Sequence, residues 1–232
     1  MQISPIIDIQ GLRYCYPDGT VALDGIDFQL HAAETVALLG ANGSGKTTFV
    51  LHLNGLLSGE GMIQICGMPL IPSNLAAIRR EVGLVFQDSD EQLFMPSVLE
   101  DVAFGPINLG LPAAEAELKA TAALRQVGMA HAASKAPYHL SAGEKRRVAI
   151  AGVLAMNPSI LVLDEPTTFL DPPGQRELVA LLQSLPQGKI IVTHDIHFAQ
   201  ALATRALFFL SGKIAAEGSV GEIVERFGWS PV

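Results

Sequence analysis

A glycine-rich stretch early in the sequence has the residue types that bind phosphate. The segment LGANGSGKTT, residues 39–48, fits the pattern G-x-x-x-x-G-K-[ST] and follows the apolar run VALL at 36–39. Glycines at this spacing let backbone N–H groups turn inward around a phosphate, and the N-terminus of the helix that follows adds partial positive charge. The pattern predicts a phosphate-binding loop made of these residues: Gly40, Ala41, Asn42, Gly43, Ser44, Gly45, Lys46, Thr47 and Thr48.

Two acidic residues follow another apolar run. In ILVLDEP, residues 160–166, Asp164 ends a strand at the sheet edge where open α/β sheets bind ligands. There it can hold Mg²⁺ together with the Thr47 hydroxyl, while Lys46 reaches the β- and γ-phosphates of a nucleotide. Glu165 is not needed for the metal, and it could polarise a water that attacks the γ-phosphate. An Asp-Glu pair alone is weak evidence, and the loop upstream makes it specific.

A histidine ends a third apolar run. The segment IIVTHD, residues 190–195, directs His194 toward the same sheet edge as Glu165, since the carboxyl ends of parallel strands share one edge. His194 is therefore predicted to hydrogen-bond the γ-phosphate and hold the attacking water. The other five histidines have no such setting and are expected to be structural: His31, His52, His131, His139 and His197.

The elements that must position these residues are short apolar runs that alternate with helical stretches. Nearly continuous Val, Ile and Leu over four or five residues is typical of parallel strands buried on both faces, and the alternation predicts an α/β domain. These runs lie at 36–39, 82–86, 160–163, 190–193 and 207–210.

Both ends of the chain indicate antiparallel strands. The segment 12–30 has two strand-like runs around an Asp18-Gly19 turn, which predicts an antiparallel β layer before the parallel core. The segment 207–218 resembles a closing hairpin that turns at Ser211-Gly212.

Residues 88–157 contain no comparable apolar run and are predicted to form a helical insertion between two core strands. Small and apolar residues recur there at steps of three and four, which defines one face of a helix. These residues are Ala113, Ala116, Ala120, Leu124 and Val127.

Composition excludes several classes of protein. The 232 residues carry a net charge of −8, which argues against a general nucleic-acid binder because such a protein needs a basic face. Cys15 and Cys66 lack metal-ligand spacing and are expected to be reduced, partly buried thiols. The N-terminus lacks the features of a signal peptide, and the longest uncharged apolar run, 148–163, is too short to span a bilayer. The chain is therefore expected in the cytoplasm.

One more segment could hold an anion. In LSAGEKRRVAIAGVLAM, residues 140–156, Ser141 and the Gly143 N–H stand at the predicted N-terminus of a helix, which attracts phosphate. The helix itself is so apolar that it must be buried.

Together these motifs resemble the ATP-binding-cassette (ABC) ATPases over almost the whole chain. The family's order is present: an aromatic residue near the start, the phosphate loop, a Gln at a strand end, the signature turn LSAGE, an Asp-Glu pair, a following Asp and a late His. The resemblance implies a P-loop NTPase with a RecA-like core at 1–87 and 158–232, in which 88–157 form a helical subdomain. All of this belongs to one domain, 1–232.

The resemblance also implies a mechanism that needs two ATPase subunits. Each ATP, with Mg²⁺, lies between the phosphate loop of one subunit and the signature turn of the other, formed here by Ser141, Ala142, Gly143 and Glu144. Tyr16 would stack on adenine, and Gln87 would touch Mg²⁺ or the attacking water. Asp171 would line the dimer interface.

The signature turn departs from the family's usual Leu-Ser-Gly-Gly-Gln at two positions. Ala142 does not readily adopt a positive φ, so the turn is expected to be stiffer. Glu144 brings a carboxylate near a phosphate site, which the neighbouring Lys145, Arg146 and Arg147 can offset. ATPase activity is expected to survive both changes.

The segment after Gln87 looks like one branch of the family. FQDSDEQLFMPSVLEDVAFGPINLGLP, residues 86–112, is similar to the ATPases of energy-coupling-factor (ECF) importers, and 52–57 and 145–156 look like its cobalt and nickel members. In that branch a transmembrane coupling protein docks in a groove beside the Gln loop, and a membrane component binds the substrate. Residues 88–94 would line this groove, with Leu93, Phe94 and Met95 as apolar contacts.

The resemblance thus predicts a peripheral subunit at the cytoplasmic face of the membrane that drives uptake of Co²⁺ or Ni²⁺. A vitamin such as biotin is the alternative substrate, because the ATPase does not touch the cargo. A non-transport ABC ATPase of DNA repair or translation is disfavoured, since those carry a long coiled coil or two cassettes in one chain. The second ATPase subunit can be an identical or a similar chain.

Overall fold

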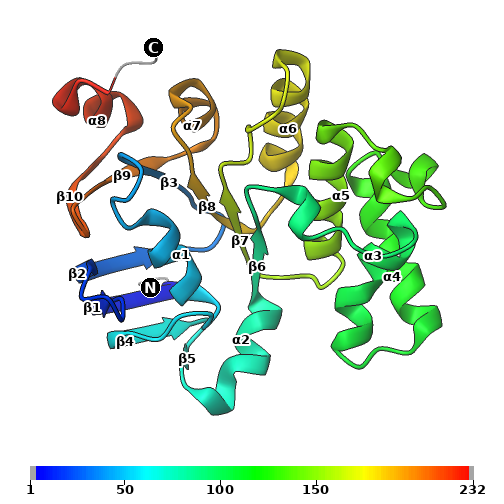
Figure 1. The fold of residues 1–232 in the computed structure, drawn as a ribbon, viewed down its shortest axis with the longest axis horizontal. Coiled ribbons are helices and arrows are strands. Elements are labelled where there is room, and N and C mark those ends of the chain that lie inside the picture. The colour runs from blue at the N-terminus through cyan, green and yellow to red at the C-terminus, as the bar shows by residue number, and fades with distance from the viewer. Residues whose placement is uncertain (1–3, 230–232) are drawn as a thin grey trace.

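The structure is a computed structural model that describes residues 4–229, arranged as two β-sheets and a group of helices (Figure 1). The strands are β1 (Ile7–Cys15), β2 (Val21–Leu30), β3 (Thr35–Leu39), β4 (Glu60–Ile65), β5 (Met68–Pro69), β6 (Val82–Val85), β7 (Ile160–Asp164), β8 (Gly188–Val192), β9 (Arg205–Leu210) and β10 (Lys213–Gly218). The α-helices are α1 (Lys46–Leu53), α2 (Leu75–Glu81), α3 (Val98–Asn108), α4 (Ala113–Gln126), α5 (Ala142–Leu154), α6 (Pro172–Ser184), α7 (Ile196–Leu202) and α8 (Val220–Phe227). Short 3₁₀ helices are η1 (Pro72–Asn74), η2 (Ser89–Glu91), η3 (Ala130–Ala132) and η4 (Pro137–His139).

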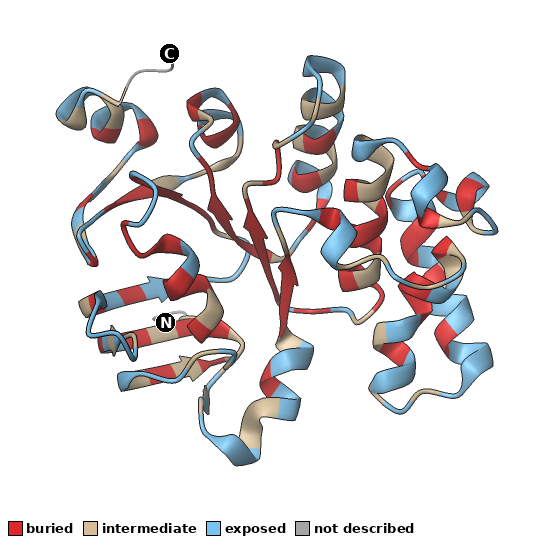
Figure 2. Ribbon diagram, in the orientation of Figure 1, coloured by how far each residue is buried: buried red, intermediate tan, exposed pale blue. Residues whose placement is uncertain are grey.

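The larger sheet is the parallel core that the apolar runs predict. Its order is β10-β9-β3-β8-β7-β6, and all neighbours from β9 to β6 pair in parallel. Every residue of β3, β6, β7 and β8 is buried, as the central strands in Figure 2 show. The strands lack polar alternation because both faces are covered. The α/β prediction is confirmed, and the carboxyl ends of β3, β7 and β8 share one edge.

The smaller sheet is antiparallel, in the order β2-β1-β4-β5. One hydrophobic cluster joins it to the core through α1: Phe49 packs edge-on against Phe28 of β2 and also contacts Phe209 of β9. Helix α1 is therefore held between two sheets, which fixes the loop that precedes it. The predicted antiparallel layer is confirmed.

The predicted hairpin at the end of the core is also confirmed. Strands β9 and β10 pair antiparallel around a two-residue loop. Ser211 and Gly212 both have positive φ, 49° and 77°, as the tight turn of a right-twisted hairpin requires.

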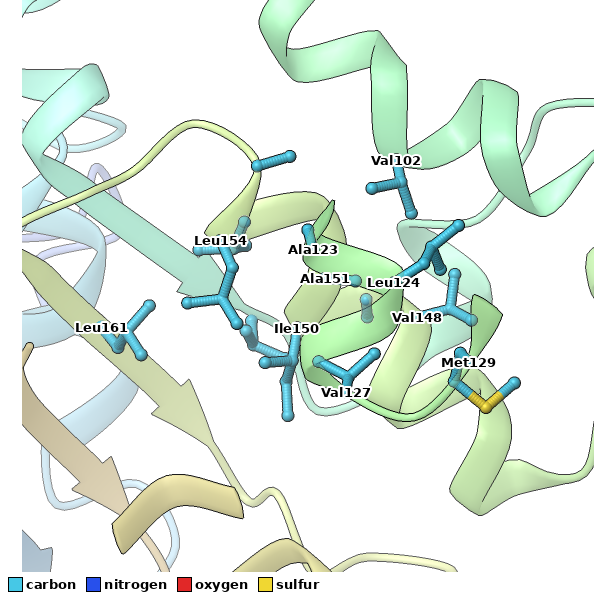
Figure 3. Close-up of a cluster of buried hydrophobic side chains, with 14 of the residues drawn as sticks. Val102, Ala123, Leu124, Val127, Met129, Val148, Ile150, Ala151, Leu154 and Leu161 are labelled. Atoms are coloured by element: carbon cyan, nitrogen blue, oxygen red, sulfur yellow. The ribbon is translucent and has the colours of Figure 1, made fainter. Parts of the chain in front are cut away.

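The segment between β6 and β7 is helical, and no strand lies among the described residues from 86 to 159. Helices α3, α4 and α5 pack around a core that includes Val102, Leu124 and Val148 (Figure 3). The predicted face is confirmed for four of its five residues: Ala116, Ala120 and Leu124 are buried on α4, and so is Val127, which caps its C-terminus. Ala113 is exposed, contrary to the prediction, because it begins the helix where no neighbour covers the first turn, and Ala123 is buried instead.

Two further observations concern the cysteines and the membrane. Cys66 is half-buried as expected, but Cys15 is exposed, because it pairs across the sheet with Val21, which is itself solvent-facing. Both are free thiols. Within residues 4–229, no helix combines the length and hydrophobicity that crossing a bilayer requires.

Candidate functional site

The phosphate-binding loop joins the end of β3 to the start of α1. Gly45 is the N-cap of α1 with φ 109°, and an added Cβ there would come within 2.6 Å of the Ala22 carbonyl oxygen. At Gly40, with φ 135°, a Cβ would come within 2.3 Å of the Phe209 carbonyl oxygen. Only glycine fits at these two positions, so the glycine spacing in the sequence reflects close backbone approach on both sides of the loop.

Lys46 lies inside this loop. Its side chain is buried, and Nζ donates to the carbonyl oxygens of Gly40 at 2.7 Å and Ala41 at 2.9 Å. Burial lowers the pKa of the Lys46 ammonium, and the nearby carboxylates of Glu165 and Asp164 act in the opposite direction. The lysine therefore lies at the same end of the sheet as the two acidic residues, as the motif predicts.

The oxygen ligands that Mg²⁺ prefers are present beside the loop. The Thr47 hydroxyl donates to Oδ2 of Asp164 at 3.3 Å. Burial raises the pKa of the Asp164 carboxyl, and the hydrogen bond from Thr47 acts in the opposite direction. The Ser44 hydroxyl is buried without a partner among the described residues. These atoms fit a magnesium ion bound to a nucleotide phosphate.

Glu165 and His194 meet at the ends of β7 and β8. Nδ1 of His194 lies 2.8 Å from Oε2 of Glu165, and the backbone N–H of His194 points at the same oxygen at 3.4 Å. Glu165 has a positive φ of 45°, held by its N–H donating to the carbonyl oxygen of Val192. A non-glycine residue in this conformation is strained, and such strain occurs where a side chain has to be aimed. The sequence predicted that both residues lie at this edge, but it did not predict their direct contact.

A hollow of about 530 Å³ opens in front of these groups. Most of the predicted nucleotide-site residues line it: Tyr16, Asn42, Gly43, Gly45, Lys46, Thr47, Thr48, Gln87, Asp164, Glu165 and His194. Gly40, Ala41 and Ser44 are not on its wall and form the loop behind it. The sequence did not predict three further residues that line the hollow: Thr20, Val21 and Ala22. They directly follow the turn after Tyr16, and this position could have indicated that they lie near the nucleotide.

Arg146 connects the signature helix α5 to the segment that carries Gln87. Its guanidinium is buried and donates one N–H to the carbonyl oxygen of Phe86 and another to that of Gln87. Burial lowers the pKa of Arg146, and the carboxylates of Asp88 and Asp164 oppose this. The fork of the guanidinium thus fixes the backbone where β6 ends. Arg146 was expected only to offset the charge of Glu144.

The two neighbours of Arg146 bind other elements. Nζ of Lys145 lies 2.6 Å from Oδ1 of Asp90 in η2. Arg147 forms an ion pair with Glu177 of α6. Three consecutive basic residues therefore attach the signature helix to three segments around the site.

The signature turn forms the start of α5. Ser141 is the N-cap: its hydroxyl accepts from the N–H of Glu144 at 3.3 Å, and the Glu144 carboxylate accepts from the N–H of Ser141 at 2.8 Å. This capping box uses the unexpected Glu144, and the hydrogen bonds from Ser141 hold the pKa of that carboxyl low. Ala142 is the first helical residue and has no positive φ, so it needs no glycine conformation. A Cβ at Gly143 would meet only Leu170, at 3.7 Å.

The signature turn and Asp171 line a second hollow, of about 430 Å³. Ser141, Ala142 and Gly143 lie on its wall, whereas Glu144 does not. Asp171 is the N-cap of α6 and accepts from the N–H of Gly174 at 2.9 Å. Among the described residues, no lining residue is shared with the hollow of the phosphate loop. The chain therefore presents two separate hollows, one in front of the glycine loop and one at the start of α5.

A third hollow lies between η2 and helices α3 and α5. It measures about 270 Å³ and is mostly apolar, with Phe94 and Phe104 packed edge to face at its rim. Of the segment 88–94, only residues 91–94 line it, because Ser89 is buried and Asp88 and Asp90 face other partners. Met95 is also absent from its wall, so the expected groove is shorter than predicted.

Comparison with known proteins identifies the family. The profile of the family described as "ABC transporter" matches residues 23–168. A Streptomyces avermitilis protein named "Putative ABC transporter ATP-binding protein" is 53% identical over 95% of this chain and 85% of its own length. The "Energy-coupling factor transporter ATP-binding protein EcfA" of Methanocaldococcus jannaschii is 46% identical over 94% and 80%.

A solved structure agrees with these relatives. CbiO1 of Clostridium perfringens, described as part of the ABC transporter complex CbiONQ, superposes with a TM-score of 0.87 at 38% identity, over 97% of this chain and 92% of its own. The fold is thus that of the ABC cassettes, P-loop ATPases that bind ATP and ADP, work as dimers with membrane components and couple ATP hydrolysis to transport. The chain belongs to the ABC transporter ATP-binding family and is an ABC-type ATPase.

Proposed function

We propose that this chain is the ATP-hydrolysing motor subunit of an ECF-type importer, a single ABC ATPase domain at 1–232 whose helical subdomain is 88–157. The observation that carries the proposal is the separation of the two phosphate-attracting hollows, beside Lys46 and beside Ser141. A chain with half of a site on each of two surfaces needs a second ATPase subunit to complete both. The similarity to EcfA and CbiO1 supports the ECF branch.

In the proposed nucleotide site, Tyr16 stacks on adenine while the loop 40–48 surrounds the phosphates. Lys46 contacts the β- and γ-phosphates. Thr47, Asp164 and Gln87 would hold Mg²⁺, which supplies charge neutralisation on the phosphate oxygens when it is bound. The contact between Thr47 and Asp164 supports this assignment, because both oxygens already face one point.

Glu165 accepts a proton from the attacking water in the proposed reaction, and Gln87 orients that water. His194 holds the carboxylate through Nδ1. A neutral imidazole that donates from Nδ1 leaves Nε2 as an acceptor, so His194 donates to a γ-phosphate only as an imidazolium.

The partner ATPase subunit would bring its signature turn to this nucleotide. In return, the signature turn of this chain would contact the partner's nucleotide; the turn consists of Ser141, Ala142, Gly143 and Glu144. The capping box uses the N–H of Glu144, and the N–H groups of Ala142 and Gly143 at the start of α5 remain for a phosphate. Asp171 lies in the same hollow as the turn, which supports its place at the dimer interface.

The apolar hollow beside Gln87 would receive the transmembrane coupling protein. Phe94 is 62% exposed at its rim. Asp101 in its wall is nearly buried, and its Oδ2 has no partner among the described residues. Asp101 Oδ1 accepts the backbone N–H groups of Phe94 and Met95 and so holds this rim in place. An apolar surface with an exposed aromatic ring suits the apolar face of an amphipathic helix. In this proposal the chain is a peripheral subunit at the cytoplasmic face of the membrane.

The substrate we propose is Co²⁺ or Ni²⁺, with a vitamin such as biotin as the alternative. The cargo would be bound by a separate membrane component. Radiotracer uptake of Co²⁺, Ni²⁺ and biotin in a strain lacking this chain discriminates these substrates, since loss of uptake would affect only the correct one.

Purification from membranes tests the proposed docking. Tagged Phe94→Glu should lose its co-purifying integral membrane protein, whereas wild type and Leu118→Glu should retain it. Leu118 is a matched control, because it is an exposed leucine, 71% exposed, on α4 and outside the hollow. Equal recovery of the membrane protein with Phe94→Glu and Leu118→Glu would contradict the docking site.

A further inference from the structure

His52 is a fully buried histidine in α1, on the helix that follows the phosphate loop. Its Nδ1 lies 2.7 Å from the carbonyl oxygen of Thr48. A carbonyl oxygen can only accept, so Nδ1 carries the hydrogen and Nε2 is unprotonated. Nε2 is buried without a hydrogen-bond partner among the described residues. A buried polar atom left unpaired is costly and needs an explanation.

The imidazole belongs to a closed circuit of contacts among four residues: His52, Tyr14, Tyr16 and Thr48. The Tyr14 ring meets the His52 ring edge to face, with centroids 4.9 Å apart, and meets the Tyr16 ring in the same manner at 5.0 Å. The Tyr16 hydroxyl lies 2.9 Å from the Thr48 hydroxyl. Two independent paths therefore lead from Tyr16 to His52, one through Tyr14 and the other through Thr48.

The imidazole is fully buried. A Cβ added at Gly59 would come 3.1 Å from Nε2 of His52, so the backbone just before β4 lies close to that edge of the ring. Burial lowers the pKa of His52, which keeps the ring neutral and its Nδ1 hydrogen on Thr48. The ring is thus fixed by a hydrogen bond on one edge and by packing on the others.

Two members of the circuit line the nucleotide hollow. Tyr16 and Thr48 are on its wall, whereas His52 and Tyr14 lie behind it. A half-buried tyrosine has two flexible torsions, and a ring that must accept a flat base is effective only in one orientation. The circuit supplies that orientation from the buried side, without touching the nucleotide.

We propose that His52 is a positioning residue that holds Tyr16 in the orientation that binds the nucleobase. The inference rests on the proposed role of Tyr16. His52 should therefore affect mainly the binding of the base and leave the hydrolysis step unchanged, because its circuit meets the phosphate loop only at Thr48, its last residue, and contacts none of Lys46, Glu165 or His194.

Two substitutions separate the two paths. His52→Asn keeps an N–H donor at the position of Nδ1 and removes the ring that supports Tyr14. His52→Phe keeps an aromatic ring and removes the donor to Thr48. Leu53→Ala is the matched control, since Leu53 is fully buried in α1 but lies outside the circuit.

The test compares the affinities for ATP and for inorganic tripolyphosphate, which has no base, by isothermal titration calorimetry. Both His52 variants should bind ATP about 3- to 10-fold more weakly, the effect of a misaligned aromatic contact, and bind tripolyphosphate like wild type. The KM for ATP should rise while kcat stays unchanged. In a Tyr16→Ala background, the His52 substitutions should have no further effect on ATP affinity.

An equal loss of ATP and tripolyphosphate affinity, or an additive effect in the Tyr16→Ala background, would overturn the inference and leave His52 a core residue of α1. A base-specific loss in Leu53→Ala would do the same. If Tyr16→Ala itself leaves ATP affinity unchanged, the proposed role of Tyr16 fails. If Tyr16→Ala weakens ATP binding and the His52 variants do not, only the inference about His52 fails.

Discussion

The imidazole of His194 holds the carboxylate of Glu165, with Nδ1 2.8 Å from Oε2. The two side chains differ in setting: Glu165 is 12% exposed and His194 is 71% exposed. A carboxylate fixed by a partner from one side presents its other oxygen to the hollow in front of the phosphate loop. The exposed His194 thus fixes the orientation of the group proposed to activate water.

His194→Ala should reduce the rate of ATP hydrolysis by about 10²-fold, since general-base catalysis by a positioned group contributes at least that much. ATP affinity should change little, because Lys46 and the loop supply most phosphate contacts. Steady-state phosphate release measures the rate. His197→Ala, a change at an exposed histidine of α7, is the control. A rate for His194→Ala equal to that control would remove His194 from the mechanism.

Lys46→Ala should weaken ATP binding by about tenfold or more, as loss of a charge-assisted contact to phosphate in a partly buried site implies. Fluorescent ATP-analogue titration measures the affinity. Lys119→Ala is the control, because Lys119 is an exposed lysine on α4 and does not line the nucleotide hollow. Unchanged affinity in Lys46→Ala would refute the phosphate-loop assignment.

Ser141→Arg should prevent ATP-driven association with the second ATPase subunit while the single chain still binds ATP, because the arginine blocks the hollow of the signature turn. Light scattering and ATP titration give the two readouts. Ser219→Arg is a closely matched control, since Ser219 caps α8 with the same kind of capping box. If Ser141→Arg damages ATP binding by the single chain as much as association, the turn does not act on a partner's nucleotide.

The sequence predicted those features that depend on local pattern. The parallel strands follow from fully apolar runs. The two hollows are lined by most of the glycine loop and by Asp164, Glu165 and Ser141, as the motifs suggest. Exposure at the ends of elements was harder to predict. Ala113 matches the periodicity of its helix, but periodicity does not reveal where the covering neighbours stop.

Contacts between distant side chains could not be predicted. Arg146 is a basic residue in a charged run, and nothing in that run shows that its guanidinium is buried against the carbonyl of Gln87, 59 residues away. His52 likewise reads as one polar residue in an apolar helix. Its circuit with Tyr16 forms only because the antiparallel layer packs on α1, which is a property of the tertiary fold.

The link between Glu34 and Arg205 predicts a pH-dependent stability. Burial alone raises the pKa of the Glu34 carboxyl, but hydrogen bonds from Arg205 and from the backbone N–H of His31 outweigh it and hold the pKa below the ordinary value of 4.5. A lowered folded-state pKa stabilises the fold above pH 4.5, and the contribution is lost as the pH falls through the folded-state value.

Glu34→Gln should therefore lower the free energy of unfolding by about 1–2 kcal/mol at pH 7, the effect of weakening a charge-assisted hydrogen bond. The difference from wild type should narrow as the pH is lowered below the ordinary value. Urea unfolding across the pH series measures it, and Glu117→Gln, at an exposed carboxylate of α4, is the control. A difference that grows in acid would contradict the assignment.

The most direct test of the account is phosphate release by Glu165→Gln, with ATP affinity measured on the same sample. The amide keeps the shape of the side chain but cannot accept the proton of the attacking water. Release should be at least about 10²-fold slower, with ATP affinity close to wild type. The variant should also accumulate in the ATP-bound, associated form. Hydrolysis at a rate near wild type would show that Glu165 is not the catalytic carboxylate and would contradict the account.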